Sequence, residues 1–89
     1  MKLNLDSIKN KKLWNDQGFE LPAYDIEAVR NNTKLEPTWI HFGAGNIFRV
    51  FPARLQDELL DNGEAETGVI IAETFNPDKI DYIFKPYDN

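Results

Sequence analysis

The sequence predicts an α/β fold in which two parallel strands are joined by a helix, a βαβ unit, after an irregular N-terminal extension. A short apolar run at 39–42 stops at a glycine, an amphipathic helical pattern follows it, and a run rich in β-branched residues occupies 68–73. About 25 residues lie between the two runs, which is enough for the helical crossover that joins parallel strands.

Length and composition narrow the class of protein further. The 89 residues are enough for one small domain at most. Fifteen acidic against ten basic residues give a net charge of −5 without a basic cluster, which argues against a nucleic-acid or anionic membrane surface. Because cysteine is absent, a disulfide framework, cysteine-ligated zinc, an iron–sulfur site and a thiol nucleophile are excluded. No apolar run reaches the about 18 residues of a membrane span, so we expect a cytoplasmic protein, and we assign no metal site.

Residues 1–37 form the predicted extension, which is polar and irregular with scattered apolar side chains. One short helix is expected at about 24–31, where an Asn-Asn pair would end it. Pro37 closes the extension because proline cannot continue a helix. The apolar residues of the extension are expected to pack against something else.

The two apolar runs are predicted to be buried strands. Length and aromatic content favour a strand over a helix at 39–42. At 68–73, Val69, Ile70 and Ile71 are three consecutive β-branched residues without polar alternation. This pattern is typical of a strand that is buried on both faces in a parallel sheet.

The crossover helix contains a proline whose position decides where the helix begins. Phe51, Leu55 and Leu59 are spaced four residues apart and form one apolar face. If the helix begins near Phe51, Pro52 occupies the first helical position, where proline is favoured. If it begins at Asn46, the proline removes a backbone hydrogen bond. We therefore expect either a tight turn at 46–50 or a kinked first turn.

A second short helix is predicted at 76–84. Asn76-Pro77-Asp78 combines a helix-capping residue, a proline at the first position and an early acid. Apolar residues follow at helical spacing, and Pro86 is expected to stop the run.

A glycine turn, Gly43-Ala44-Gly45, lies between the first strand and the crossover helix, the setting that a dinucleotide-binding fingerprint requires. Gly43 allows a sharp turn, and Gly45 lacks a Cβ, so a pyrophosphate can approach the backbone. The first N–H groups of the helix and its dipole favour the phosphate charge. The third fingerprint position is Phe48 instead of glycine, which forces a wider or shifted helix approach. The turn alone is equally compatible with a purely structural role.

Glu73 ends the second strand and lies 25 residues after Phe48, close to the spacing of about 20 expected for a ribose-binding acid. Such a carboxylate accepts hydrogen bonds from both ribose hydroxyls and repels a 2′-phosphate. No arginine follows nearby, and Lys79 is the only near cation, so NAD is favoured over NADP. The alternative is a solvated acid at a strand end.

Three neighbouring polar residues have two interpretations each. His41 lies inside a strand and is expected to be a packed or hydrogen-bonded residue, not a catalyst. Asn46 either caps the turn or points its amide at the cofactor, and Arg49 pairs with phosphate or with a nearby acid. The predicted cofactor-binding residues are Gly43, Ala44, Gly45, Asn46, Ile47, Phe48, Arg49 and Glu73.

The segment WIHFGAGNIFRVFPARLQDELL at 39–60 resembles the N-terminal cofactor-binding strand, loop and helix of the long-chain mannitol dehydrogenase family of polyol and hexuronate dehydrogenases. The family's loop has an apolar-His-apolar-Gly-x-Gly-Asn start followed by arginine, matched here from Ile40 to Arg49. This chain departs at Phe48 and at 50–52, where mannitol dehydrogenases often have histidines. The departure points away from mannitol and toward a mannonate-type oxidoreductase.

The resemblance implies a Rossmann-like dinucleotide-binding fold and metal-independent hydride transfer between a nicotinamide and a secondary alcohol or ketone of a polyol or hexuronate. The family's catalytic lysine belongs to a Lys-x-x-x-x-Asn-x-x-His pattern that is absent here, so no catalytic residue is assigned. Residues 38–89 would be the first βαβ portion of an NAD(P)-binding domain.

Because two strands bury little surface, we expect an N-terminal fragment of a larger dehydrogenase of carbohydrate metabolism, of the mannitol dehydrogenase or fructuronate reductase (mannonate oxidoreductase) type. The fragment alone should be inactive. Its exposed apolar strands should be covered by self-association or by a missing C-terminal part. The alternative is a non-enzymatic nucleotide-binding or assembly module.

Overall fold

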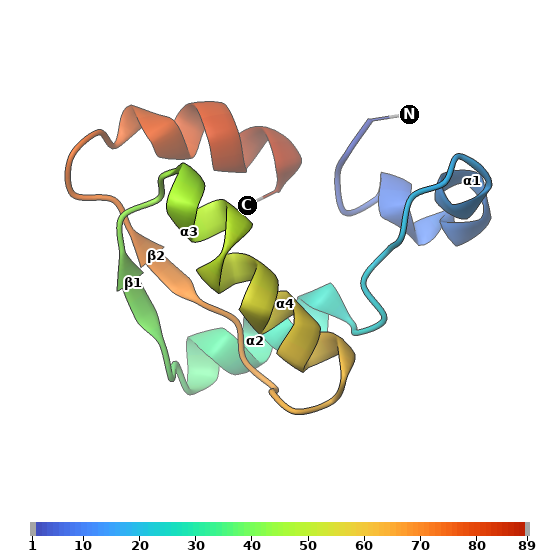
Figure 1. Cartoon of the computed structure of the whole chain (residues 1–89), viewed down its shortest axis with the longest axis horizontal. Coiled ribbons are helices and arrows are strands. Elements are labelled where there is room, and N and C mark those ends of the chain that lie inside the picture. The colour runs from blue at the N-terminus through green and yellow to red at the C-terminus, as the bar shows by residue number, and fades with distance from the viewer. Residues whose placement is uncertain (1, 89) are drawn as a thin grey trace. The chain divides into compact units, whose positions relative to one another are not determined.

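The computed structural model describes residues 2–88 (Figure 1). Within this part of the chain, none of the helices is long and apolar enough to cross a membrane. The chain divides into two compact units. One consists of residues 22–75, and the other combines the segments before Pro22 and after Phe75.

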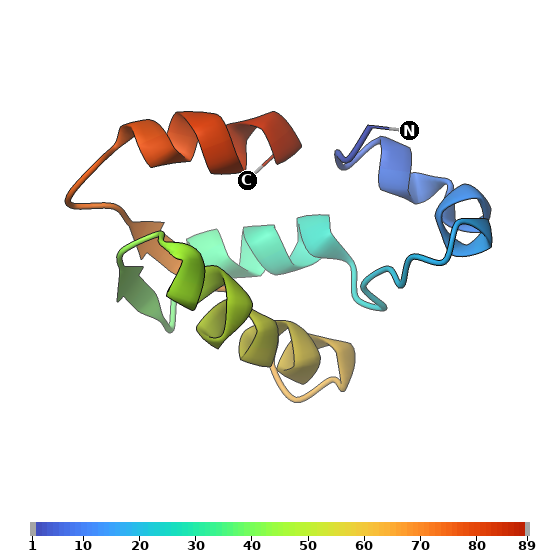
Figure 2. The ribbon, with the colours of Figure 1, turned by 45° about the horizontal axis from the view of Figure 1, so that its top comes forward.

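The unit at 22–75 contains the predicted βαβ arrangement. Strands β1 (Ile40–Phe42) and β2 (Ile70–Ala72) pair in parallel, with His41 opposite Ile71. Helices α3 (Asn46–Val50) and α4 (Pro52–Asp61) lie between them in the chain. Figures 1 and 2 show α3 and α4 in front of the strand pair and α2 behind it. The predicted α/β class with parallel strands is therefore confirmed.

The crossover is kinked at its first turn, one of the two arrangements expected from Pro52. Phe51 separates α3 from α4 with φ −121° and ψ −76°, and Pro52 is the first residue of α4. The Phe51 N–H still donates to the Ile47 carbonyl at 3.1 Å, and the Phe51 carbonyl accepts from Leu55 N–H at 3.0 Å. The hydrogen bond that the proline nitrogen cannot donate is therefore lost at the joint, where the axis changes.

Helix α2 (Ile26–Leu35) is longer than predicted, because the Asn-Asn pair does not end it. The Asn32 side chain donates to the Glu66 carbonyl at 3.2 Å. The Thr33 hydroxyl accepts from Gly68 N–H at 2.8 Å. These side chains bond to the segment that leads into β2, so tertiary partners replace the local turn that asparagine otherwise favours.

The predicted burial of both strand faces is wrong for the described residues. The side chains of Phe42 and Ile40 are 72% and 54% exposed, and Ile70 is 37% exposed. The buried apolar residues of 22–75 lie instead at the glycine turn and on the crossover helices: Ala44, Phe48 and Leu60. Each three-residue strand has one neighbour among the described residues, so each strand leaves an edge unpaired, and the few short elements beside so small a sheet do not bury its apolar side chains fully.

The second unit is built around Trp14, which is buried in α1 (Lys11–Asp16). Its indole N–H donates to the Ser7 carbonyl at 3.1 Å, and its ring meets the Phe19 ring edge-on at 5.2 Å between centroids. Ser7 begins a short 3₁₀ segment, η1 (Ser7–Lys9).

The helix predicted at 76–84 differs in type and in length. The structure has a π-helical turn, η2 (Ile80–Phe84), followed directly by a 3₁₀ segment, η3 (Lys85–Tyr87). Pro86 does not stop the run, because it lies at the start of η3, where a missing N–H is tolerated. The Leu5 N–H donates to the Asp88 carboxylate at 2.9 Å and joins the two ends of this unit.

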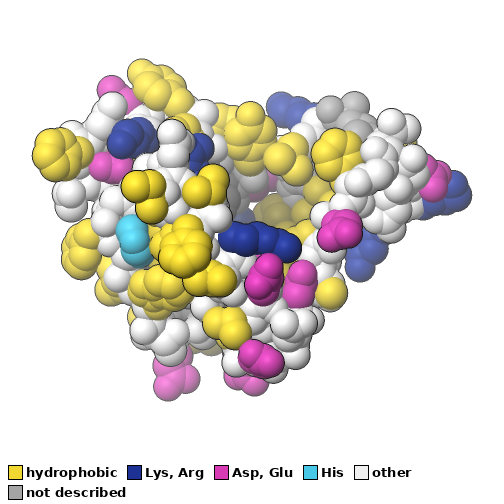
Figure 3. Space-filling model, viewed as in Figure 1, with side chains coloured by type: hydrophobic (Ala, Val, Ile, Leu, Met, Phe, Trp, Pro, Cys, Tyr) yellow, Lys and Arg dark blue, Asp and Glu magenta, His cyan; other side chains and the backbone are white. Residues whose placement is uncertain are grey.

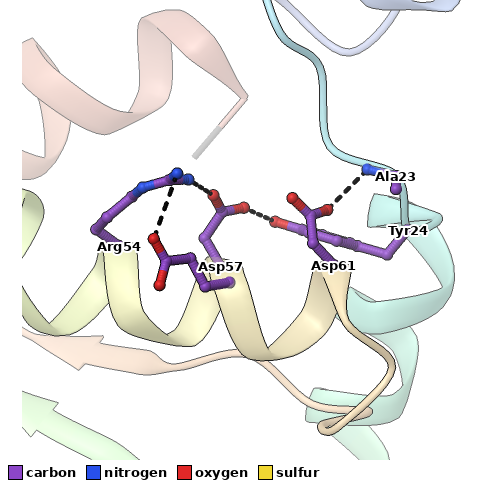
Figure 4. A network of polar contacts seen from close by, with 6 residues as sticks. Ala23, Tyr24, Arg54, Asp57 and Asp61 are labelled. Carbon is purple, nitrogen blue, oxygen red and sulfur yellow. Dashed lines mark hydrogen bonds and ion pairs between the residues drawn. The ribbon is translucent and has the colours of Figure 1, made fainter.

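A polar network ties the start of α2 to α4 (Figure 4). The Tyr24 hydroxyl donates to Asp57 at 2.7 Å, and Ala23 N–H donates to Asp61 at 2.8 Å. Asp57 also accepts from the Arg54 guanidinium on the same helix. The residues before α2 are therefore anchored on the crossover helix.

Raising the pH above about 10 is expected to destabilise the protein through Tyr24. Burial, followed by the hydrogen bond and the charge of Asp57 and the charge of Asp61, raises the pKa of the Tyr24 hydroxyl above its ordinary value of 10.0. The unfolded chain therefore releases this proton first, so the contribution of Tyr24 to stability is complete below pH 10.0 and declines as the pH rises further.

Urea unfolding from neutral pH to about pH 11 measures this decline. The Tyr24→Phe variant lacks the ionisable group and is expected to lose less stability over the same range. Identical alkaline losses in both proteins would contradict the assignment.

Candidate functional site

The glycine turn begins where β1 ends, and only one of its two glycines is required by the backbone. Gly43 has φ +108°, a conformation that residues with a side chain rarely adopt, and its N–H donates to the Ala72 carbonyl at 2.8 Å. Gly45 has φ −79° and ψ −175°, which any residue adopts. A Cβ built on Gly45 meets no atom of the protein within 4 Å. Nothing in the fold therefore demands a glycine at position 45.

The peptide between Gly43 and Ala44 is hydrogen-bonded at both of its polar ends. The Ala44 N–H donates to Glu73 Oε2 at 2.9 Å. The Gly43 carbonyl lies 3.0 Å from His41 Nδ1. Because a carbonyl oxygen can only accept, Nδ1 is the protonated nitrogen of this contact. Ala44 itself is fully buried.

Glu73 follows β2 directly and reaches the turn that follows β1. The parallel pairing places the carboxyl ends of both strands at the same edge, so residues 29 positions apart meet. The second carboxylate oxygen accepts from Phe75 N–H at 3.0 Å. Glu73 is half-buried and bonded to two backbone amides, in contrast to the solvated strand-end acid of the alternative interpretation.

Asn46 and Arg49 bond to each other. The Arg49 guanidinium donates to the Asn46 side-chain oxygen. The Asn46 side chain therefore does not cap α3, and Arg49 is paired here with an amide and not with an acid. The Arg49 Nε atom is buried and lacks a hydrogen-bond partner among the described residues. The pair lies on the first turn of α3, directly after the glycine turn.

Phe48 takes the place of the third fingerprint glycine and is buried. Its ring lies against the His41 ring, with 4.4 Å between centroids. Two aromatic rings thus fill the space between helix and strand. The prediction that His41 is a packed or hydrogen-bonded residue is confirmed, and the structure shows both kinds of contact. Its bond to Gly43 was not predicted, although a spacing of two residues across a glycine turn is a signal that could have indicated it.

One other predicted residue does not join this cluster through its side chain. The Ile47 side chain is 79% exposed.

Comparison with known proteins gives one strong match and two negative results. No family model matches the chain, and no solved structure matches it. The chain is 44% identical, over all 89 of its residues, to the D-mannonate oxidoreductase of Thermotoga maritima. It spans 16% of that protein's length. The chain is thus related over its whole length to part of a mannonate oxidoreductase, and its resemblance to the long-chain mannitol dehydrogenase family is confirmed.

Proposed function

We propose that this chain is the N-terminal cofactor-binding portion of an NAD-dependent oxidoreductase that acts on a secondary alcohol or ketone of a hexuronate, in the manner of a mannonate oxidoreductase. One observation is central: Glu73 and the glycine turn meet at the carboxyl ends of two parallel strands, through the Ala44 N–H. In open α/β sheets this edge is where nucleotides bind. The relationship to a D-mannonate oxidoreductase supports the substrate class.

The residues present suit a dinucleotide. The open space beside Gly45 leaves room for a diphosphate to approach the backbone. The first amides of α3, from Asn46 on, lack carbonyl partners within the helix and are suited to an anion. When bound, the nicotinamide would accept or supply the hydride. This chain's residues would bind and orient the adenosine and diphosphate part.

Glu73 would select the cofactor. A carboxylate at this position accepts hydrogen bonds from ribose hydroxyls and repels a 2′-phosphate. Because a 2′-phosphate would be repelled here, we expect the carboxylate to favour NAD over NADP.

The chemistry and the missing packing would be supplied by other parts of a larger parent protein. The family's lysine–asparagine–histidine pattern is absent from the 89 residues, so we assign the chain alone no activity. Hydrophobic side chains gather over and beside α3 (Figure 3). Val50 and Phe51 are 73% and 61% exposed, and Phe42 at the end of β1 is 72% exposed. We infer that the rest of the parent protein, or a second copy of this chain, covers this surface in the cytoplasm.

Calorimetric titration of the 89-residue chain with NAD, NADP, FAD and S-adenosylmethionine tests the proposal. We expect NAD to bind best, and Glu73→Gln to weaken NAD binding about tenfold, because a charged hydrogen-bond acceptor is lost. Glu64→Gln changes an exposed glutamate of the loop before β2 and serves as the control. A preference for FAD or S-adenosylmethionine, or binding of none of the four, would favour the non-enzymatic module instead.

A further inference from the structure

The Gly43–Ala44 peptide is held from two sides, by one side chain from β1 and one from the residue that follows β2. His41 is the central residue of β1, and Glu73 follows β2. His41 Nδ1 contacts the carbonyl of this peptide at 3.0 Å, and Glu73 Oε2 accepts its N–H at 2.9 Å. A peptide plane bonded at both ends cannot rotate without breaking a hydrogen bond. The turn therefore has one fixed orientation.

The His41 ring is itself fixed in place. It packs against the buried Phe48 ring at 4.4 Å, and Phe48 comes from the middle of α3. The donor nitrogen is therefore positioned by the helix that follows the turn. The His41 imidazole, which belongs to β1, therefore contacts both the glycine turn and α3.

We propose that His41 is a positioning residue for dinucleotide binding. Together with Glu73 it holds the Gly43–Ala44 peptide, so that the open space beside Gly45 and the first amides of α3 keep the orientation that a diphosphate requires. This inference rests on the proposed function. It assigns to His41 no contact with the cofactor and no chemical step.

Two substitutions separate this role from simple packing against Phe48. His41→Phe keeps an aromatic ring for the contact but removes the N–H donor. His41→Asn removes the ring but retains a side-chain N–H close to the position of Nδ1. A packing role predicts that asparagine is the worse replacement, whereas the positioning role predicts that phenylalanine is.

The first measurement is amide hydrogen exchange, by NMR, of the full 89-residue chain without any nucleotide. Ala44 N–H reports the held peptide. Ile70 N–H, which donates to the Trp39 carbonyl at 3.0 Å, reports the sheet. In His41→Phe we expect Ala44 exchange to rise about fivefold relative to Ile70, the factor that corresponds to a net hydrogen bond of about 1 kcal/mol. In His41→Asn the ratio should stay near the wild-type value.

A matched control tests the opposite end of the strands. The Thr38 and Thr67 hydroxyls share a hydrogen bond of 2.7 Å just before β1 and β2. Thr38→Ala removes this bond and is expected to leave Ala44 exchange unchanged relative to Ile70.

The second measurement is the NAD affinity of the same variants by calorimetry. We expect His41→Phe to weaken binding about fivefold and His41→Asn to retain it.

Unchanged Ala44 exchange in His41→Phe would overturn the positioning role, whatever the chain binds. Faster exchange with unchanged NAD affinity would also overturn it. If His41→Phe unfolds, the Ala44 and Ile70 amides will exchange equally fast, and the test then depends on His41→Asn. Fast Ala44 exchange relative to Ile70 in His41→Asn would show that a side-chain N–H at position 41 does not hold the peptide. If the exchange results are as expected but the wild-type chain does not bind NAD, the proposed function is rejected and the positioning of the peptide by His41 is not.

Discussion

Replacement of Gly45 with valine is expected to weaken dinucleotide binding strongly while leaving the fold intact. Backbone angles of φ −79° and ψ −175° suit any residue, and a Cβ at this position meets no protein atom within 4 Å. Neither the backbone angles nor the added Cβ therefore introduces strain into the chain itself. Its branched side chain fills the space through which a diphosphate would approach the backbone amides of the turn.

The expected loss of NAD affinity is about hundredfold, which corresponds to the upper end of about 1–3 kcal/mol for forcing extra atoms into a fitted site. Calorimetry measures the affinity, and the urea midpoint, expected to be unchanged, measures the stability. Gly45→Ala adds only a methyl group and should have an intermediate effect on binding. Wild-type NAD affinity in the valine variant would show that no ligand approaches Gly45.

Replacement of Gly43 with alanine is expected to have the opposite result, a clear loss of stability. At φ +108° a residue with a Cβ is strained, and such strain costs about 1–3 kcal/mol. No protein atom lies within 4 Å of the added Cβ, so the backbone conformation alone is the cause. Urea unfolding should show a lower midpoint at an unchanged slope.

Gly63 provides the comparison for this effect. It has φ +74°, in the left-handed region that asparagine tolerates, and it follows α4. Gly63→Asn is therefore expected to lose less stability than Gly43→Ala. If Gly43→Ala is as stable as the wild-type protein, the backbone at the turn does not require a glycine at position 43. Gly43 and Gly45 would then not differ in what the backbone requires.

The sequence was sufficient to predict what depends on local chemistry. The glycine turn between strand and helix, the parallel pairing and the kink at Pro52 all follow from backbone preferences of glycine, β-branched residues and proline. The approach of Glu73 to the turn follows from the pairing, because parallel strands end at one edge. The resemblance on residues 39–60 depended on the same local pattern.

The features that were not predicted depend on distant partners. Helix α2 continues past its asparagine pair because Asn32 and Thr33 bond to the segment before β2, 34 and 35 residues away. Burial of the strands was overestimated. β-branched residues indicate that the apolar side chains of a strand require cover by other parts of a protein, but not that the same chain provides this cover. Pro86 would stop a continuous α-helix, whereas in the structure a new 3₁₀ segment begins there.

The double attachment of Glu73 has a practical meaning for anyone who would redesign the coenzyme preference. The usual strategy exchanges a ribose-binding acid for a small or basic residue so that a phosphorylated ribose is tolerated. Here that exchange would also remove the acceptor for the N–H groups of Ala44 and Phe75. The Glu73 carboxylate would both select the cofactor and hold the turn through the Ala44 N–H. A switch to NADP at this position therefore needs a second substitution that restores an acceptor for Ala44.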